Sequence, residues 1–134
     1  MDAVPYLAAL SALGGLGLAA YFYVAVTAAS PGNSRMVELM EAIQSGASAF
    51  LRREYRWVAG FVVLMAVLIF ALLDYGRPWG AIAYVAGAFL SALAGFVGMT
   101  IATKANARTA NAAIEGAHNA LPLAFRGGAV MGFT

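Results

Sequence analysis

The stretch WGAIAYVAGAFLSALAGFVGMTIAT, residues 79–103, contains no charged side chain and decides the fold class. A helix needs about 20 mostly apolar residues to cross the roughly 30 Å hydrocarbon core of a bilayer, so this run predicts a transmembrane helix. Small residues recur along it at helical spacing, at Gly87, Ser91, Gly95 and Gly98. Because such spacing lets helix backbones approach closely in lipid, we expect a helix that packs against others.

The composition of the whole chain agrees with a membrane protein. Of its 134 residues, 63% are apolar or aromatic and 10% are charged, with a mean hydropathy of +0.81. Soluble domains carry about 25% charged residues, and disordered chains are poor in apolar ones, so both classes are excluded. The net charge of +2 is too small for a nucleic-acid footprint, and no nucleic-acid partner is expected. The absence of cysteine excludes disulfides and thiolate metal sites.

Three further apolar runs complete the predicted architecture. We expect one all-α transmembrane domain over residues 1–134, with helices at about 4–29, 57–73, 79–103 and 121–134. Only eight residues follow Arg126, too few for the fourth helix to cross the membrane. We therefore predict three transmembrane helices and the truncated start of a fourth, as the N-terminal part of a larger multi-helix protein. Whether the native chain ends at Thr134 is left open.

Two polar connections are expected to be helical. Between the first two spans, apolar residues recur on one helical face, which predicts an amphipathic helix that runs into the second span. The residues of this face are Met36, Leu39, Met40, Ile43, Ala47, Phe50 and Leu51. Residues 104–120 are rich in alanine and asparagine and continue the third span, with a break near Gly116.

Basic residues predict the orientation in the membrane. Short loops rich in lysine and arginine stay in the cytoplasm. Seven basic residues lie in or beside the two long connections, and only Arg77 lies on the opposite side. These seven are Arg35, Arg52, Arg53, Arg56, Lys104, Arg108 and Arg126. We expect an integral, multi-pass membrane protein with its N-terminus outside and both long loops in the cytoplasm. The arginines at 52, 53 and 56 are best explained as topology markers in contact with lipid headgroups.

The chain offers little chemistry of its own. Gly15, Gly17 and Ala20 match the string of a dinucleotide fingerprint, but no strand precedes them, so the mechanism cannot operate. His118 and Glu115 would give two metal ligands, too few for zinc, and a solvated polar face is favoured.

The carboxylates also argue against ion transport by these residues alone. An ion carrier keeps an ionisable residue inside the bilayer, whereas every carboxylate here lies outside the predicted spans: Asp2, Glu38, Glu41, Glu54, Asp74 and Glu115. Asp74 is the nearest to a span and is interpreted as a helix-end residue. We therefore predict no catalytic, cofactor-binding or metal-binding residue in the chain.

Three strings resemble those of membrane-bound, ion-pumping inorganic pyrophosphatases, the pyrophosphate-energized proton or sodium pumps. EAIQSGASAFLRREY at 41–55 is similar to the first cytoplasmic segment of that family. Residues 91–95 with GMTIATKANARTA at 98–110 are similar to its third helix, and AFRGGAVMG at 124–132 is similar to the start of its fourth. Together these strings cover most of residues 35–134, in order and at compatible spacing.

The resemblance implies an enzyme that hydrolyses cytoplasmic pyrophosphate to phosphate and exports protons or sodium ions. It implies Mg²⁺ as the cofactor, water as the nucleophile, and a large single-chain pump that forms a homodimer in the membrane lipid. No Asp-rich metal segment of the family matches this chain, so the catalytic and Mg²⁺-binding residues are expected in other helices of the same pump. The pumped ion and any potassium dependence depend on residues outside the resemblance.

The matched positions imply structural roles for particular residues. The residues that would join the amphipathic helix to the second span are Gly46, Phe50, Arg53, Glu54 and Tyr55. Gly95 and Gly98 would permit close helix packing. The residues that would form a polar cytoplasmic helix end are Lys104, Asn106, Arg108 and Thr109. His118 and Pro122 lie in a part that matches the family less closely.

An alternative from another class stays open. The chain could be a complete small membrane scaffold or assembly subunit without catalysis. Its small residues at 87, 91 and 95 would then dock on partner helices, and its arginines at 52–56 would hold anionic lipid. That alternative predicts a stable oligomer of the 134-residue chain in detergent.

Overall fold

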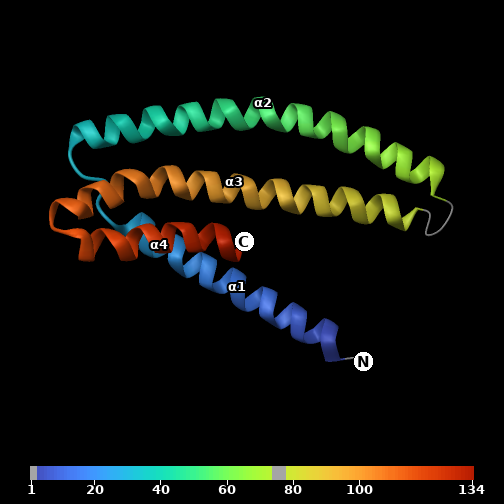
Figure 1. Ribbon diagram of the computed structural model, residues 1–134, viewed down its shortest axis with the longest axis horizontal. Coiled ribbons are helices and arrows are strands. Elements are labelled where there is room, and N and C mark those ends of the chain that lie inside the picture. Colours follow the sequence, from blue (N-terminus) through green and yellow to red (C-terminus); the bar gives the residue numbers. More distant parts are fainter. Residues whose placement is uncertain (1–2, 74–77) are drawn as a thin grey trace. The chain divides into compact units, whose positions relative to one another are not determined.

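The computed structural model describes residues 3–73 and 78–134, which form four α-helices and, within those ranges, no strand (Figure 1). The helices are α1 (Ala3–Ala28), α2 (Ser34–Leu72), α3 (Trp79–Ile114) and α4 (Ala117–Phe133). Each of the first three is long and apolar enough to cross a membrane. The predicted all-α membrane fold with three spans is confirmed. Asp2, Asp74 and Arg77, which carry expectations above, lie outside the described residues.

A sharp turn separates α1 from α2. Pro31 cannot continue a helix because it lacks an amide hydrogen, and Gly32 adopts a positive φ of 94° that glycine tolerates best. The side chain of Asn33 then accepts a hydrogen bond from the Met36 amide at 3.0 Å. This is the N-cap arrangement that satisfies one of the free amides at the start of a helix. Local sequence therefore fixes where α2 begins.

Both long helices extend beyond the length of a membrane span. α2 has 39 residues and α3 has 36, which corresponds to about 58 Å and about 54 Å at 1.5 Å per residue. The predicted amphipathic helix runs without a break into the second span, as expected. The third span likewise continues as helix past Thr103 to Ile114.

The break near Gly116 is confirmed, but the fourth helix begins earlier than the hydropathy indicates. Gly116 has a φ of 129°, and its carbonyl accepts the amides of Asn119 and Ala120. α4 therefore starts at Ala117, about one turn before the apolar run at 121–134, and Pro122 lies inside it. Its first turn was missed because that turn is polar, while backbone hydrogen bonds to Gly116 form regardless of polarity.

The described residues fall into two compact units. The first unit comprises Met1–Ala47 and Val97–Thr134, and the second comprises Ser48–Phe96. In the first unit, α4 turns back at Gly116 and packs against α1 (Figure 1), with the rings of Phe22 and Phe133 stacked at 6.2 Å. Its core joins three helices through buried side chains, namely Val26, Ile101, Ala105, Leu123 and Val130.

The second unit contains one part of α2 and one part of α3. None of its described residues is buried, and large apolar side chains such as Trp57, Phe61 and Phe89 are more than half exposed. In a membrane protein such surfaces face lipid or other helices. The core of the described chain therefore lies in the first unit.

Candidate functional site

The most polar contact region of the first unit lies where α3 passes the end of α1. Lys104, Arg108 and Asn111 follow one another at intervals of four and three residues, so they share one face of α3. Each donates a hydrogen bond to a residue between Tyr23 and Ser30. We call these three side chains the α3 polar stripe.

Arg108 makes the largest set of contacts in the stripe. Its guanidinium donates to the carbonyl oxygens of Ala29 at 3.0 Å and Thr27 at 3.5 Å, and to that of Lys104 in its own helix at 2.9 Å. One of its nitrogens also lies 3.4 Å from the sulfur of Met40. The last carbonyls of a helix have no partner within the helix, and a basic side chain that reaches them satisfies both their hydrogen bonds and the helix dipole. Arg108 therefore caps the end of α1.

The other two residues of the stripe lie on either side of this cap. The ammonium of Lys104 donates to the Tyr23 hydroxyl at 3.1 Å and lies 5.5 Å from the centre of the Tyr23 ring. The amide of Asn111 donates to the carbonyl of Ser30 at 3.5 Å. A cation near an aromatic ring and a hydroxyl gains from both, which holds the Lys104 charge inside the unit. The polar helix end inferred from the sequence thus connects α3 to the end of α1 through hydrogen bonds.

Asn106 and Thr109, assigned to the same helix end, have a different position. They line an open groove of about 500 Å³ between α3 and α4, whose other wall includes Ala124 and Gly128. At its base, Gly127 approaches α3 so closely that a Cβ there would lie 2.9 Å from the Cβ of Ala105. Gly127 is a close-packing position that the sequence reading missed, since the glycine pair at 127–128 gave no sign of which member faces α3.

Two of the three glycines of the third span that were expected to permit close packing lie against other side chains. A Cβ at Gly98, in the first unit, would lie 2.6 Å from Cγ of Met131. In the second unit, a Cβ at Gly95 would lie 3.2 Å from the hydroxyl of Tyr55. By contrast, a Cβ at Gly87 would meet nothing within 4 Å.

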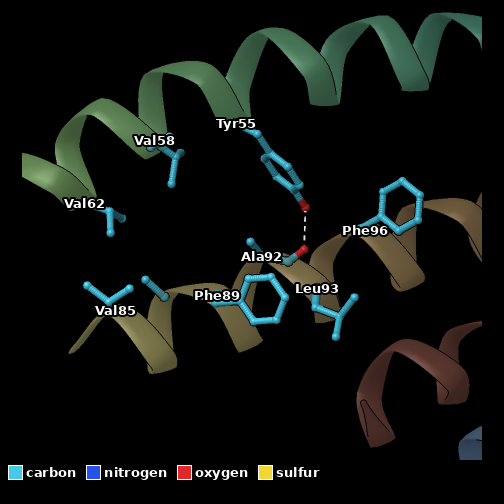
Figure 2. Close-up of a pocket in the computed structure, with 10 residues that line it drawn as sticks. Tyr55, Val58, Val62, Val85, Phe89, Ala92, Leu93 and Phe96 are labelled. Atoms are coloured by element: carbon cyan, nitrogen blue, oxygen red, sulfur yellow. Dashed lines mark hydrogen bonds between the residues drawn. The ribbon is translucent and has the colours of Figure 1, made fainter. Parts of the chain in front are cut away.

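Tyr55 joins the two helices of the second unit. Its hydroxyl donates to the backbone carbonyl of Ala92 at 2.6 Å (Figure 2). Beyond this bond lies a groove of about 440 Å³ whose walls are almost wholly apolar, with Val58 and Val62 on α2 facing Val85 and Phe89 on α3 (Figure 2). Its lining contains no acidic or basic side chain, so the groove offers a surface for apolar chains.

Four predicted residues of α2 make no specific contact within the described ranges. Phe50, Arg53 and Glu54 are exposed, and a Cβ at Gly46 would meet no atom within 4 Å. Their role at the junction with the second span stays a prediction.

Comparison with known proteins defines the family. The family model of inorganic H⁺ pyrophosphatase matches residues 13–134. This chain belongs to the inorganic H⁺ pyrophosphatase family. Among curated relatives in this family, a K⁺-insensitive pyrophosphate-energized proton pump of Methanosarcina mazei is 45% identical over 132 residues, which is 98% of this chain and 20% of the relative. A similar proton pump of Pyrobaculum aerophilum is 39% identical over 140 aligned positions, covering 100% of this chain and 19% of the relative.

Relatives that pump a different ion are also similar to this pyrophosphatase-family chain. A putative K⁺-stimulated pyrophosphate-energized sodium pump of Bacteroides thetaiotaomicron is 40% identical over 121 residues, covering 87% of this chain and 16% of the relative. The chain thus spans about a fifth or less of the length of these three relatives. No solved structure matches it. The resemblance seen in the sequence is confirmed, and the relatives are ion pumps energized by pyrophosphate.

The described part of this pyrophosphatase-family chain brings no three metal-ligating side chains together. Glu115 accepts a hydrogen bond from Asn119 at 3.1 Å, and His118 packs against Gly116. Arg35 and Glu38 pair at 2.7 Å on an exposed face. The polar contacts between α1 and α3 centre on Arg108.

Proposed function

We propose that these residues form part of one transmembrane domain of a pump that hydrolyses cytoplasmic pyrophosphate to phosphate and exports protons or sodium ions. The observation that carries this proposal is the family match over residues 13–134. It is supported by relatives at 45% and 40% identity, one described as a proton pump and the other as a putative sodium pump. Because both kinds are similar to this chain, the proposal covers both ions.

Within such a pump, the role we assign to these residues is to hold helices in register. The α3 polar stripe caps α1 through Arg108, and Gly98 and Gly127 let α4 approach α3. An arginine that satisfies free carbonyls stabilises a helix end in any surroundings with little water. This part of the chain would therefore act as scaffold for catalysis carried out elsewhere.

Magnesium would be bound by other segments. Mg²⁺ prefers oxygen ligands, above all carboxylates, and the described carboxylates are scattered over α2 and the break between α3 and α4. They do not fit a Mg²⁺ site, since no three come together. We place the Mg²⁺ ligands in the roughly four fifths of the relatives' length that this chain does not cover.

The orientation and assembly complete the proposal. Seven basic residues flank the two long connections, which favours a cytoplasmic location for both and an external N-terminus. Arg108 and Lys104 would then lie at the cytoplasmic end of the membrane region. A homodimer embedded in lipid is the expected assembly.

The test begins with the reading frame that encodes this chain. Its complete product is expressed in membranes that lack pyrophosphatase, and inverted vesicles are assayed for Mg²⁺-dependent pyrophosphate hydrolysis. Uptake of protons and of sodium is followed in parallel, with and without potassium, and crosslinking of the product reports whether it is a dimer. We expect hydrolysis coupled to uptake of one of the two ions. A product without hydrolysis that forms a stable oligomer would instead support the scaffold without catalysis.

A further inference from the structure

Three arginines mark the point where α2 changes from polar to apolar. Arg52, Arg53 and Arg56 are exposed, and within the described residues none of them makes a hydrogen bond or an ion pair. From residue 57 to the end of α2 at Leu72 no charged side chain follows. The arginines therefore lie where a spanning helix leaves the hydrocarbon and meets the headgroups.

A groove begins at one of these arginines and continues along the apolar part of the helix. Arg56, Gly60 and Leu64 are spaced four residues apart, and Trp57 and Phe61 form the neighbouring row. These five residues line a groove of about 490 Å³. Gly60 leaves its floor open, because a Cβ there would meet no atom within 4 Å.

The walls of this groove are free to contact a ligand. Trp57 is 75% exposed and Phe61 is 59% exposed. The groove thus has a cationic end, an amphipathic tryptophan beside it, and an apolar body that follows the helix. Tryptophan favours the headgroup level of a bilayer, and an arginine guanidinium forms paired hydrogen bonds with phosphate oxygens.

We propose that this groove binds an anionic phospholipid, with its phosphate on Arg56 and Arg52 and one acyl chain lying over Gly60. Charge decides the occupant, since the unpaired arginines attract a net negative headgroup, whereas the ammonium of a zwitterionic lipid offsets its own phosphate. A soluble phosphate would use the arginines and leave the apolar body of the groove empty. The inference requires only that α2 spans a membrane, so it stands or falls separately from the proposed pump function.

The two tryptophans of the chain allow a direct test. In the Trp79→Phe variant, Trp57 is the remaining tryptophan and reports on the groove. The 134-residue chain is placed in phosphatidylcholine vesicles that contain a minor fraction of either dibromo-phosphatidylglycerol or dibromo-phosphatidylcholine. Bromine quenches tryptophan fluorescence on contact. We expect the anionic lipid to quench Trp57 more than the zwitterionic lipid does at the same mole fraction.

Two variants with matched controls locate the binding. Arg56→Gln should lower the preference for the anionic lipid about fivefold, the factor for one basic residue at a membrane surface. Arg35→Gln, which removes an equal charge outside the groove, should leave it unchanged. Gly60→Leu fills the groove and should reduce the preference with all charges intact, while Gly46→Leu, at another open glycine of α2, should not. Circular dichroism confirms that each variant is helical.

Four results would overturn the proposal. Equal quenching by the two lipids would show that the site does not select charge. If Arg56→Gln and Arg35→Gln lowered the preference for the anionic lipid equally, the preference would come from the net charge of the whole chain and not from the groove. If inorganic phosphate at fixed ionic strength abolished the preference for the anionic lipid, the arginines would bind a soluble anion in place of the lipid headgroup. Failure of both brominated lipids to quench Trp57 would show that protein covers the groove.

Discussion

The two units are made of the same kind of apolar helix, but the contacts between helices inside one unit differ from those inside the other. In the first unit, Val26, Ile101 and Val130 from three helices are fully buried, and Arg108 caps the end of α1. In the second unit no described residue is buried, and Tyr55 links α2 to α3 through one carbonyl, that of Ala92. Apolar composition alone therefore gives helices long enough to span a membrane. A fixed arrangement of these helices relative to one another also needs a third helix and polar contacts.

This difference has an energetic consequence. Between helices surrounded by lipid there is no hydrophobic driving force, so close packing and hydrogen bonds carry the association. The first unit has both, at Gly98, at Gly127 and along the α3 polar stripe. We therefore expect substitutions in the first unit to lower the free energy of unfolding more than substitutions of the same type in the second unit.

The largest effect is expected from Gly127→Val. A Cβ at Gly127 would lie 2.9 Å from the Cβ of Ala105, a short side chain that cannot rotate away, so α3 and α4 must separate. Overpacking of this kind costs up to about 3 kcal/mol. Gly128→Val is the control, because a Cβ there meets nothing within 4 Å. The free energy of unfolding is measured by circular dichroism in mixed detergent micelles, and equal losses in the two variants would refute close packing at Gly127.

Arg108→Met should have the next largest effect. The variant keeps an unbranched apolar stem but removes the donors to Ala29, Thr27 and Lys104, which leaves the end of α1 uncapped. Loss of hydrogen bonds to a charged group costs about 2 kcal/mol. Arg35→Met, at an exposed ion pair, should change the same unfolding free energy by less than about 0.5 kcal/mol. If the two losses were alike, Arg108 would not be a cap.

Tyr55→Phe tests the connection in the second unit. It removes the hydrogen bond to the Ala92 carbonyl and should cost about 0.6 kcal/mol, the average for hydrogen bonds between membrane helices. Tyr6→Phe, at a side chain that is 73% exposed, serves as the control and should be neutral. A loss larger than that of Arg108→Met would reverse the ranking of the two units.

The smallest effect separates two glycines of α3. Gly87→Ala should stabilise the helix by roughly 0.5 kcal/mol, since alanine restricts the unfolded chain and nothing lies within 4 Å of the new methyl group. Gly95→Ala should lose this gain, because its methyl group would lie 3.2 Å from the Tyr55 hydroxyl. Both are compared by thermal unfolding in detergent. A destabilised Gly87→Ala would point to a partner helix at Gly87, as the scaffold alternative requires.

Much of the fold could be predicted because charge-free length is visible in the residues themselves. The spans and the continuation of the third span to the break at Gly116 follow from hydropathy. Small-residue spacing marks Gly95 and Gly98 as close-packing positions, but it also marks Gly87, where a Cβ would meet nothing within 4 Å. The early start of α4 could not be predicted in this way, because its first turn, Ala117–Ala120, is held by backbone hydrogen bonds and contains His118 and Asn119.

The site was predicted in part. Lys104 and Arg108 were assigned to a polar helix end, but hydropathy cannot say which carbonyls they reach. Asn111 completes the spacing of four and three residues along the α3 polar stripe, so the sequence does carry a signal for it. Tyr23 lies in an apolar span, and only the need of its hydroxyl for a partner could have marked it.

Pulsed electron spin resonance tests the contrast between the units most directly. The chain has no native cysteine, so spin labels can be placed at chosen pairs in lipid nanodiscs. Val24→Cys with Phe125→Cys reports on α1 and α4 in the first unit, and Val63→Cys with Leu90→Cys reports on α2 and α3 in the second, all at exposed positions. We expect a narrow distance distribution for the first pair and a broader one for the second. Equal widths, or a broader distribution in the first unit, would contradict the view that its core and the Arg108 cap fix the first unit.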